Sequence, residues 1–479
     1  MQPLDSALPN PPADRRCPAA RRRFLVRATA LVLLLAVGGA CAWALAYPEH
    51  TPSAVGEIVE QLTGANPHPV HLERPASAPL SAMALLGKQI FFDANLSASG
   101  KLSCASCHSP AHAYGPPNAL PVQFGGPSMT LQGDRPPPSL MDLCRQPNFS
   151  IGPEKADDDT PANFAQQAAR ASGVARAQKT AGATPAKPAD VPQGGMFWDG
   201  RADTLQMQAF GPLLNPVEMA NTSEEEVARK FDGDAYRKVF VQLFGPDIFK
   251  NPRMLLSEAM FAVARYQVED PSFHPYSSKY DYWLEGRARL TQAELRGLTL
   301  FNDPQKANCA GCHLSQPSRD GQPPMFTDYE YEALGVPRNT ALAVNRNAGY
   351  FDMGLCGPHR TDLAAQTQFC GMFLTPSLRN VATRHAFFHN GVYRSLDQVL
   401  KFYNLRDIEP GKIYPHDAKG HVAQYDDLPA KYHANIDKAD APFDRNPGDT
   451  PSMTDADIKD IIAFLQTLND GYQPDGKTR

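Results

Sequence analysis

Leu86–Pro110, LGKQIFFDANLSASGKLSCASCHSP, is the stretch from which the rest of the chain can be interpreted, because it contains Cys104, Cys107 and His108 in the pattern CxxCH. Two thiols separated by two residues can add to the two vinyl groups of a porphyrin, and the histidine that follows can bind the iron. The pattern therefore predicts a covalently bound haem c.

The motif occurs a second time, as Cys309, Cys312 and His313. A short apolar segment precedes each copy, ending in IFFD before the first and in LFND before the second. This internal duplication predicts two haem-binding units. The four cysteines could instead bind one zinc ion as thiolates, but a zinc site does not require a histidine directly after both pairs.

The composition is that of an ordinary globular protein. Of the 479 residues, 42% are hydrophobic and 20% are charged, and a chain of this length is expected to form roughly two to four domains. The 46 basic and 51 acidic residues give a formal net charge of −5, which argues against a nucleic-acid partner.

Residues 1–47 have the features of a signal peptide or a membrane anchor. Arginines, Arg21–Arg23 among them, precede an uncharged run from Ala28 to Tyr47 that contains the small residues needed for signal cleavage. The run is also long enough to span a bilayer, and the positive charge before it would keep the N-terminus in the cytoplasm. We therefore expect a periplasmic protein, either released or tethered to the inner membrane by this segment.

Two haem domains are expected after a polar linker at 48–78. The first domain covers 79–275 and the second covers 276–479. An insertion at 153–193, rich in Ala, Asp, Lys, Thr and Pro, is expected to be mobile. Helical periodicity before the first motif and the scarcity of β-branched alternation predict a mainly α fold.

Capping boxes begin two of the predicted helices. Thr291 with Glu294 begins the helix that leads to the second motif, and Thr454 with Asp457 begins the last helix of the chain. The segment 395–404, SLDQVLKFYN, has apolar residues at helical spacing and is predicted to be a third helix.

Four stretches together resemble the bacterial dihaem cytochrome c peroxidases and their relative MauG. They are LGKQIFFDANLS with the first CxxCH motif, FWDGRADTLQMQAFGPLLNPVEM at 197–219, the second motif CAGCH, and TPSLRNVATRHAFFHNGVYRSLDQVLKFYN at 375–404. The likeness runs from about residue 79 to residue 468 and fails over 153–193. It implies two cytochrome c-like α domains, with a peroxide-reacting haem in the first and an electron-transfer haem in the second.

The resemblance implies roles for three residues of the second stretch. Trp198 matches a tryptophan that lies between the haems and can relay an electron. Gln208 and Glu218 match a polar pair on the open face of the peroxide-reacting haem, where a carboxylate can take a proton from peroxide and return it to the leaving oxygen. Without the resemblance, these residues would be interpreted as a core Trp, a surface Gln and a helix-end Glu.

Two positions depart from typical members of that family. Phe124 stands where they have a histidine that blocks the first iron until reduction, so the first haem is expected to be open without an activation step. Tyr403 stands where they have the methionine ligand of the second iron, as it does in MauG, and a phenolate would lower the potential of that haem. Met353 and Met372 remain alternative ligands, and Tyr403 could instead be a packed helix residue.

Two further features concern calcium and cross-linking. The family's calcium site is not expected, because Pro136 replaces its asparagine ligand and Arg384 and Ala386 replace two of its carbonyl-donating residues. Cys356 and Cys370 lie in one loop of a chain expected to be exported, so we expect them to form a disulfide.

The leading hypothesis is a periplasmic dihaem c-type peroxidase that reduces hydrogen peroxide with electrons from a small cytochrome c or a cupredoxin, entering through the second haem. The alternative is a MauG-like oxidase that uses peroxide to oxidise residues of a protein partner, which Phe124 and Tyr403 favour. A third hypothesis is a dihaem electron carrier. Gln208, Glu218 and the missing distal histidine argue against it, because a carrier needs both irons six-coordinate.

Overall fold

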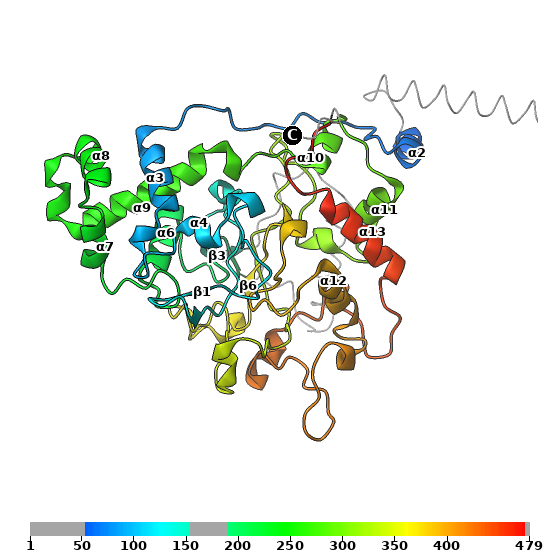
Figure 1. Ribbon diagram of the computed structural model, residues 1–479. Coiled ribbons are helices and arrows are strands. Elements are labelled where there is room, and N and C mark those ends of the chain that lie inside the picture. Colours follow the sequence, from blue (N-terminus) through cyan, green and yellow to red (C-terminus); the bar gives the residue numbers. More distant parts are fainter. Residues whose placement is uncertain (1–52, 154–189, 475–479) are drawn as a thin grey trace, which may run out of the picture. The chain divides into compact units, whose positions relative to one another are not determined.

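The computed structural model describes residues 53–153 and 190–474 (Figure 1). The predicted export segment at 1–47 and most of the predicted insertion at 153–193 lie outside these residues. Within the described ranges, no helix combines the length and the hydropathy that a membrane span requires. The chain divides into two units, Met1–Pro69 and Val70–Arg479, which are described separately.

The described part of the first unit contains one helix, α2 (Ser53–Thr63). It falls within the segment 48–78, for which the sequence predicted a polar linker. Val59 is a buried apolar side chain of the helix, whereas Ile58 and Leu62 remain exposed. Near its end the Thr63 hydroxyl donates a hydrogen bond to the Val59 carbonyl, at 2.7 Å.

The second unit is mainly helical, as the sequence predicted. Its α-helices are α3 (Ala82–Phe92), α4 (Cys104–Cys107), α6 (Leu205–Leu214), α7 (Glu224–Lys230), α8 (Asp234–Phe244), α9 (Pro252–Glu269), α10 (Lys279–Leu284), α11 (Gln292–Asn302), α12 (Leu396–Leu405) and α13 (Asp455–Gln466). Among the described residues, the strands form three short antiparallel pairs: β1 (Phe124–Gly125) with β2 (Leu131–Gln132), β3 (Ser150–Pro153) with β4 (Asp190–Gln193), and β5 (Tyr331–Glu332) with β6 (Phe373–Leu374).

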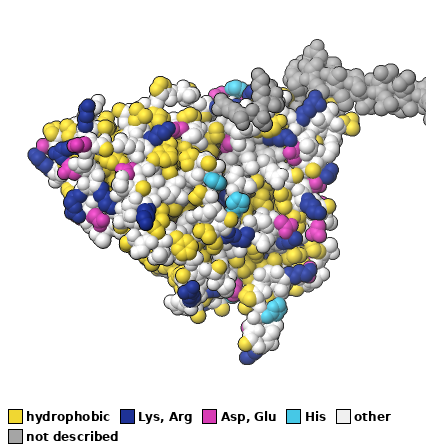
Figure 2. All heavy atoms as spheres, in the orientation of Figure 1, with side chains coloured by type: hydrophobic (Ala, Val, Ile, Leu, Met, Phe, Trp, Pro, Cys, Tyr) yellow, Lys and Arg dark blue, Asp and Glu magenta, His cyan; other side chains and the backbone are white. Residues whose placement is uncertain are grey.

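The helices surround two large hydrophobic cores. The first core takes its buried side chains from Leu86 to Phe273, and the second takes them from Leu72 and from Tyr280 to Leu468. In Figure 1, α3 and α6 to α9 lie on one side of this unit and α10 to α13 on the other. On the face drawn in Figure 2, basic and acidic side chains are interspersed.

The sequence duplication is also a structural duplication. The helix before the first motif, α3, packs on α9, and the helix before the second motif, α11, packs on α13. Each crossing depends on a glycine at the same place in its repeat. A Cβ atom at Gly87 would lie 1.8 Å from the carbonyl oxygen of Ala262, and one at Gly297 would lie 2.0 Å from that of Asp460. Since no larger residue fits, the two glycines set how closely each helix pair approaches.

The predicted helix starts are confirmed. Thr291 caps α11 by accepting a hydrogen bond from the Glu294 amide, and Thr454 caps α13 in the same way with Asp457. Both capping boxes are complete, because the acidic side chain also accepts from the amide of the cap residue. Ser395 caps α12, the third predicted helix.

Candidate active site

The two CxxCH motifs present their histidines in the same way. Nδ1 of His108 lies 3.1 Å from the carbonyl oxygen of Tyr114, and Nδ1 of His313 lies 2.8 Å from that of Phe326. An imidazole that donates from Nδ1 to a carbonyl keeps Nε2 free to bind a metal. Each histidine is therefore oriented as a ligand.

Burial keeps these groups uncharged. It lowers the pKa of His108 and of His313 to about 4, so both imidazoles are neutral and able to bind iron. Burial also raises the pKa of Cys104 and of Cys309 to about 12. The motifs thus offer two thiols and one neutral imidazole each, the donor set that a haem c requires.

The second motif lines a cavity of about 590 Å³. This volume is within the range of roughly 300–1,000 Å³ that is typical of cofactor sites. The walls opposite the motif residues are largely apolar and include Val399, Leu400 and Tyr403 of α12 and the nearby Phe443. Both the volume and the donor set fit a haem.

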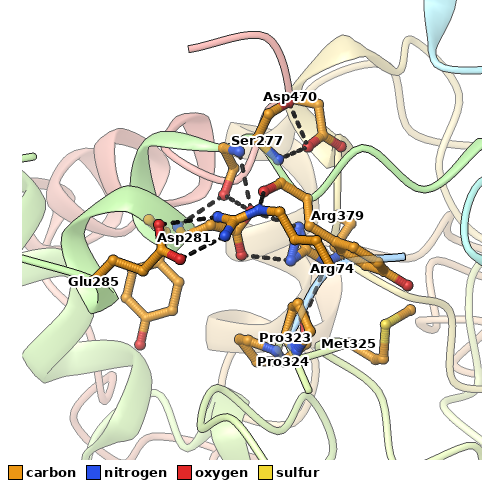
Figure 3. Close-up of polar contacts among 12 residues, drawn as sticks. Arg74, Ser277, Asp281, Glu285, Pro323, Pro324, Met325, Arg379 and Asp470 are labelled. Atoms are coloured by element: carbon orange, nitrogen blue, oxygen red, sulfur yellow. Dashed lines mark hydrogen bonds and ion pairs between the residues drawn. The ribbon is translucent and has the colours of Figure 1, made fainter. Parts of the chain in front are cut away.

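A buried ion pair holds the loop that orients His313 (Figure 3). Arg379 pairs with Asp281 through two hydrogen bonds of 2.6 and 3.1 Å. The exposed fraction of the side chain is 1% for Arg379 and 0% for Asp281. The same guanidinium donates from Nε to the carbonyl oxygen of Pro324, at 3.0 Å. Because Phe326, two residues later, supplies the oxygen that fixes His313, this ion pair helps to position the candidate ligand.

Tyr403 lies in the wall of the second cavity, on α12, as the sequence predicted for a possible ligand. Its ring stacks on Phe443, with centroids 5.3 Å apart, and burial raises its pKa above the ordinary value. A phenol in such a place stays protonated unless a metal binds it.

The rival methionines pack elsewhere. Met353 packs against the cluster that contains Tyr414, and Met372 against the cluster that contains Leu355. Met325 and Met453, which the sequence reasoning did not single out, do line the second cavity.

The first motif lines a narrower cavity of about 140 Å³. Its walls also include Gln208 from α6 and Glu218 from the turn that follows this helix. Here the fit to a haem rests on the donor set, because the volume is below the usual range for a cofactor. The three predicted groups therefore share one cavity: the motif, the amide and the carboxylate.

Glu218 is held in place and its charge is disfavoured. Nδ2 of Asn215 donates a hydrogen bond of 2.6 Å to its Oε1, and the Glu218 carbonyl accepts from the Gly126 amide at 2.9 Å. Burial raises the pKa of the carboxyl group, against the opposing effect of the Arg201 guanidinium. A carboxyl group whose pKa is raised accepts a proton more readily than an ordinary carboxylate and can return it to a substrate.

Trp198 lines both cavities, together with Phe197 and Gln208. Its indole N–H donates to the carbonyl oxygen of Pro136, at 3.0 Å, and its own carbonyl accepts from the Leu374 amide. The ring is thus fixed between residues of the two halves of the unit.

Phe124, on β1, also lines the first cavity and is 39% exposed. A residue that the sequence reasoning missed lines the same cavity: His359, whose Nε2 lies 2.5 Å from Oδ2 of Asp134. No local motif marks His359, because it reaches the cavity from the second half of the chain.

The predicted disulfide between Cys356 and Cys370 is confirmed. Arg384, at a position of the family's calcium site, donates from Nη2 to the carbonyl oxygen of Pro137, at 3.1 Å, and burial lowers its pKa to about 10. The absence of calcium stays a prediction.

Comparisons with known proteins agree with these features. Residues 81–289 match the family model described as di-haem cytochrome c peroxidase. The methylamine utilization protein MauG of Paracoccus denitrificans is 34% identical over 338 residues, which cover 69% of this chain and 76% of that protein. The cytochrome c551 peroxidase of Nitrosomonas europaea is 30% identical over 324 residues, covering 67% and 72%. The diheme peroxidase BthA of Burkholderia thailandensis has a similar structure, with a TM-score of 0.69, 35% identity and coverage of 84% and 91%.

Proposed function

Because the chain belongs to the di-haem cytochrome c peroxidase family, which includes MauG, we propose that it reduces hydrogen peroxide in the periplasm. The family implies two haem groups and an oxidoreductase of the peroxidase type. In the proposed reaction, hydrogen peroxide takes up two electrons and two protons and becomes two molecules of water. The electrons come from a small cytochrome c or a cupredoxin through the second haem.

Each haem would be attached covalently by one CxxCH motif. Cys104 and Cys107 would hold the first through thioether bonds, and Cys309 and Cys312 the second, with the following histidine as iron ligand in each case. Bound in this way, the haems supply the iron centres for electron transfer and for reaction with peroxide. The contacts of both Nδ1 atoms with backbone carbonyl oxygens support this assignment, because they leave Nε2 as the atom that would bind iron.

The observation that carries the proposal is the position of Glu218 in the cavity of the first motif. There the carboxylate takes a proton from one peroxide oxygen and returns it to the other, which leaves as water. Asn215 orients the carboxylate, and Gln208 offers an amide in the same cavity. Trp198, which lines both cavities, is the proposed path for electrons between the two sites.

A steady-state assay tests the proposal. Protein carrying both haems is mixed with hydrogen peroxide and a reduced small cytochrome c, and oxidation of the cytochrome is followed by absorbance. We expect two cytochromes to be oxidised per peroxide, without prior reduction of the enzyme, because Phe124 replaces the blocking histidine. No oxidation above that of free haem, with both small cytochromes and cupredoxins, would reject the proposal.

Tyr403 favours a second candidate function, the MauG-like oxidation of residues in a protein partner. Its phenol group lines the second cavity, and a phenolate ligand would favour oxidised states of the second haem over rapid uptake of electrons. The two functions differ in one measurement: a MauG-like enzyme would keep the oxidising equivalents of peroxide for seconds or longer when a reduced cytochrome is present.

The periplasmic location rests on residues 1–47. Cell fractionation with an antibody against the second unit would test it. Recovery of the haem-containing protein in the cytoplasm would contradict the proposal.

A further inference from the structure

His359 enters the cavity of the first motif from the second half of the chain. It lines that cavity together with Cys107 and Glu218, and its side chain is 30% exposed. His359 is therefore in contact with both the solvent and the space that Glu218 faces. The proposed roles of His108 as iron ligand and of Glu218 as acid and base give no role to this imidazole.

The loop that carries His359 is firmly attached. Three residues before it, Cys356 forms the disulfide with Cys370. The next residue, Arg360, donates from Nη1 to the carbonyl oxygens of Asp199 and Gly200, each at 3.0 Å, in the segment that follows Trp198. The imidazole is thus placed by the fold, and not by a mobile surface loop.

Asp134 completes a pair with His359. Its Oδ2 lies 2.5 Å from Nε2 of the imidazole and accepts a hydrogen bond from the Tyr350 hydroxyl, at 3.1 Å. Burial opposes the charge on Asp134, but the hydrogen bond and the charge of His359 hold the pKa of the carboxyl group well below its usual range. An ionised aspartate in this position accepts a hydrogen bond from the imidazole and fixes its orientation.

The other charged groups around the pair are themselves partnered. Arg135, next to Asp134, forms ion pairs with Asp199 and Asp352, at 2.8 and 2.7 Å. Arg201, in the wall of the cavity, also pairs with Asp199. Both guanidinium groups thus form their ion pairs with other carboxylates, and although the charge of Arg135 also lowers the pKa of Asp134, the direct ion-pair partner of Asp134 is His359.

We propose that His359, supported by Asp134, transfers protons between solvent and the first cavity during peroxide reduction, an inference that rests on the function proposed above. Moving a proton from one peroxide oxygen to the other, the role of Glu218, brings in no new proton. The reaction nevertheless consumes two protons for each peroxide, and both must enter from solvent. His359 gives its proton into the cavity and regains one from water, while Asp134 holds the imidazole ring through its hydrogen bond. Asp134 also lines the cavity, but in this proposal it acts as a positioning residue for His359.

Two variants test the proposal in the protein carrying both haems. His359→Gln keeps a polar side chain of similar length but cannot transfer a proton, so we expect kcat to fall roughly 10–100-fold with little change in KM for peroxide. The solvent deuterium isotope effect on kcat should rise, because proton entry becomes rate-limiting. Asp134→Asn should lower kcat about tenfold, since it leaves the imidazole in place but unsupported.

The chain offers a matched control. His421 pairs with Asp417 on the surface, with Nδ1 3.3 Å from Oδ2 and a side chain that is 76% exposed. His421→Gln removes a histidine from an equivalent pair, and we expect it to change neither kcat nor the isotope effect. All variants should contain two haems and show the absorption spectrum of the wild-type protein.

Cyanide binding tests the same step without turnover. Hydrogen cyanide must lose its proton as it binds a ferric haem, so His359→Gln should slow the binding measured by stopped-flow absorbance. Normal binding and a normal isotope effect in an active enzyme would overturn the inference alone, whereas an inactive wild-type enzyme would overturn the proposed function. If His359→Gln converted a low-spin first haem to high-spin, His359 would be an iron ligand, and the inference would be wrong.

Discussion

The two CxxCH sites are preceded by equivalent helices and fix their histidines in the same way, but the residues that line their cavities differ. In both, a helix with a glycine at its crossing point leads to the motif, and the motif histidine is fixed through Nδ1 by a backbone carbonyl oxygen. The first cavity then receives Glu218 and His359, which do not line the second, whereas the second receives Tyr403 and Phe443, which do not line the first. Duplication thus accounts for where two haems would be held, and segments outside the duplication account for what each could do.

The difference has a simple origin in the chain. Of the polar groups that line only the first cavity, Glu218 comes from the turn after α6 and His359 from the disulfide-bonded loop of the second half. The aromatic wall of the second cavity includes Tyr403 on α12, a helix that begins after both motifs. Substitutions in these segments should therefore change one site without changing the other.

The largest effect is expected from removing a cysteine of either CxxCH motif, the feature that the two sites share. If each motif holds its own haem, as proposed, Cys104→Ala should leave only the second haem covalently bound, and Cys309→Ala should leave only the first. The haem content, measured from the reduced pyridine complex, should fall from two to one per chain. Purified wild-type protein that contained zinc and no covalent haem would contradict the duplication of haem sites.

Glu218→Gln should slow peroxide cleavage by roughly 10²- to 10⁴-fold, as expected for loss of a general acid–base group. Burial raises the pKa of Glu218, so the base form appears only as the pH rises above about 4.3, the ordinary value for Glu. The rate should therefore increase with pH on its acid side, and this limb should vanish in the variant.

Two controls accompany this prediction. The haem content and the spectrum of the second haem should stay unchanged in Glu218→Gln, since the residue lines only the first of the two cavities. Glu225→Gln, on the surface of α7, should leave the rate unchanged. A Glu218 variant with a near-normal rate would give this residue a structural role.

The parts that the sequence predicted correctly are those encoded by short-range patterns. The capping boxes of Thr291 and Thr454 and the helix over 395–404 all depend on residues a few positions apart. The pair Cys356–Cys370 was also predictable, because both cysteines lie in one loop.

The parts that could not be predicted depend on the folded arrangement. His359 and Asp134 are far apart in sequence, and neither belongs to a recognisable motif, so only the fold brings them to one cavity. The buried pair Arg379–Asp281 is a similar case. Met353 and Met372, the alternative ligands, do not line the second cavity, and sequence distance could not indicate this, because it does not show which side chains face a cavity.

The next prediction concerns the second site alone. If Tyr403 binds the second iron, Tyr403→Met should raise the potential of that haem by on the order of 0.1 V, part of the roughly 0.8 V that axial ligands can span. The cause is that a thioether donates less electron density than a phenolate. A spectroelectrochemical titration measures both haems at once, and the potential of the first should not move.

Tyr403→Phe separates ligation from packing, because it removes only the hydroxyl group. Its spectrum should lose the signature of the phenolate ligand, whereas Tyr432→Phe, in a different hydrophobic cluster, should have no effect. An unchanged spectrum and potential in Tyr403→Phe would exclude Tyr403 as ligand, and Met325 and Met453, which line the same cavity, would be substituted next.

A smaller effect should show that the two helix crossings, α3 with α9 and α11 with α13, are equivalent. Gly87→Ala and Gly297→Ala each force a Cβ against a backbone carbonyl oxygen of the neighbouring helix, and overpacking of this kind costs at least about 1–3 kcal/mol. Both variants should lower the melting temperature by similar amounts. Gly152→Ala meets no atom within 4 Å and should change stability by less than about 0.5 kcal/mol. A large loss in only one of the two variants would show that the crossings differ.

The smallest effect is expected from chelators, which should change neither activity nor the spectrum of either haem. In this chain Pro136 has no side-chain oxygen, and the guanidinium of Arg384 donates to the carbonyl oxygen of Pro137. A cation brought close to that guanidinium would be repelled, because burial keeps solvent from screening the two charges. The double variant Pro136→Asn with Arg384→Thr restores an oxygen donor and removes the positive charge, so it should gain calcium binding measurable by calorimetry. Loss of wild-type activity in EDTA, with recovery on adding calcium alone, would contradict this account and show that other oxygen atoms bind the ion.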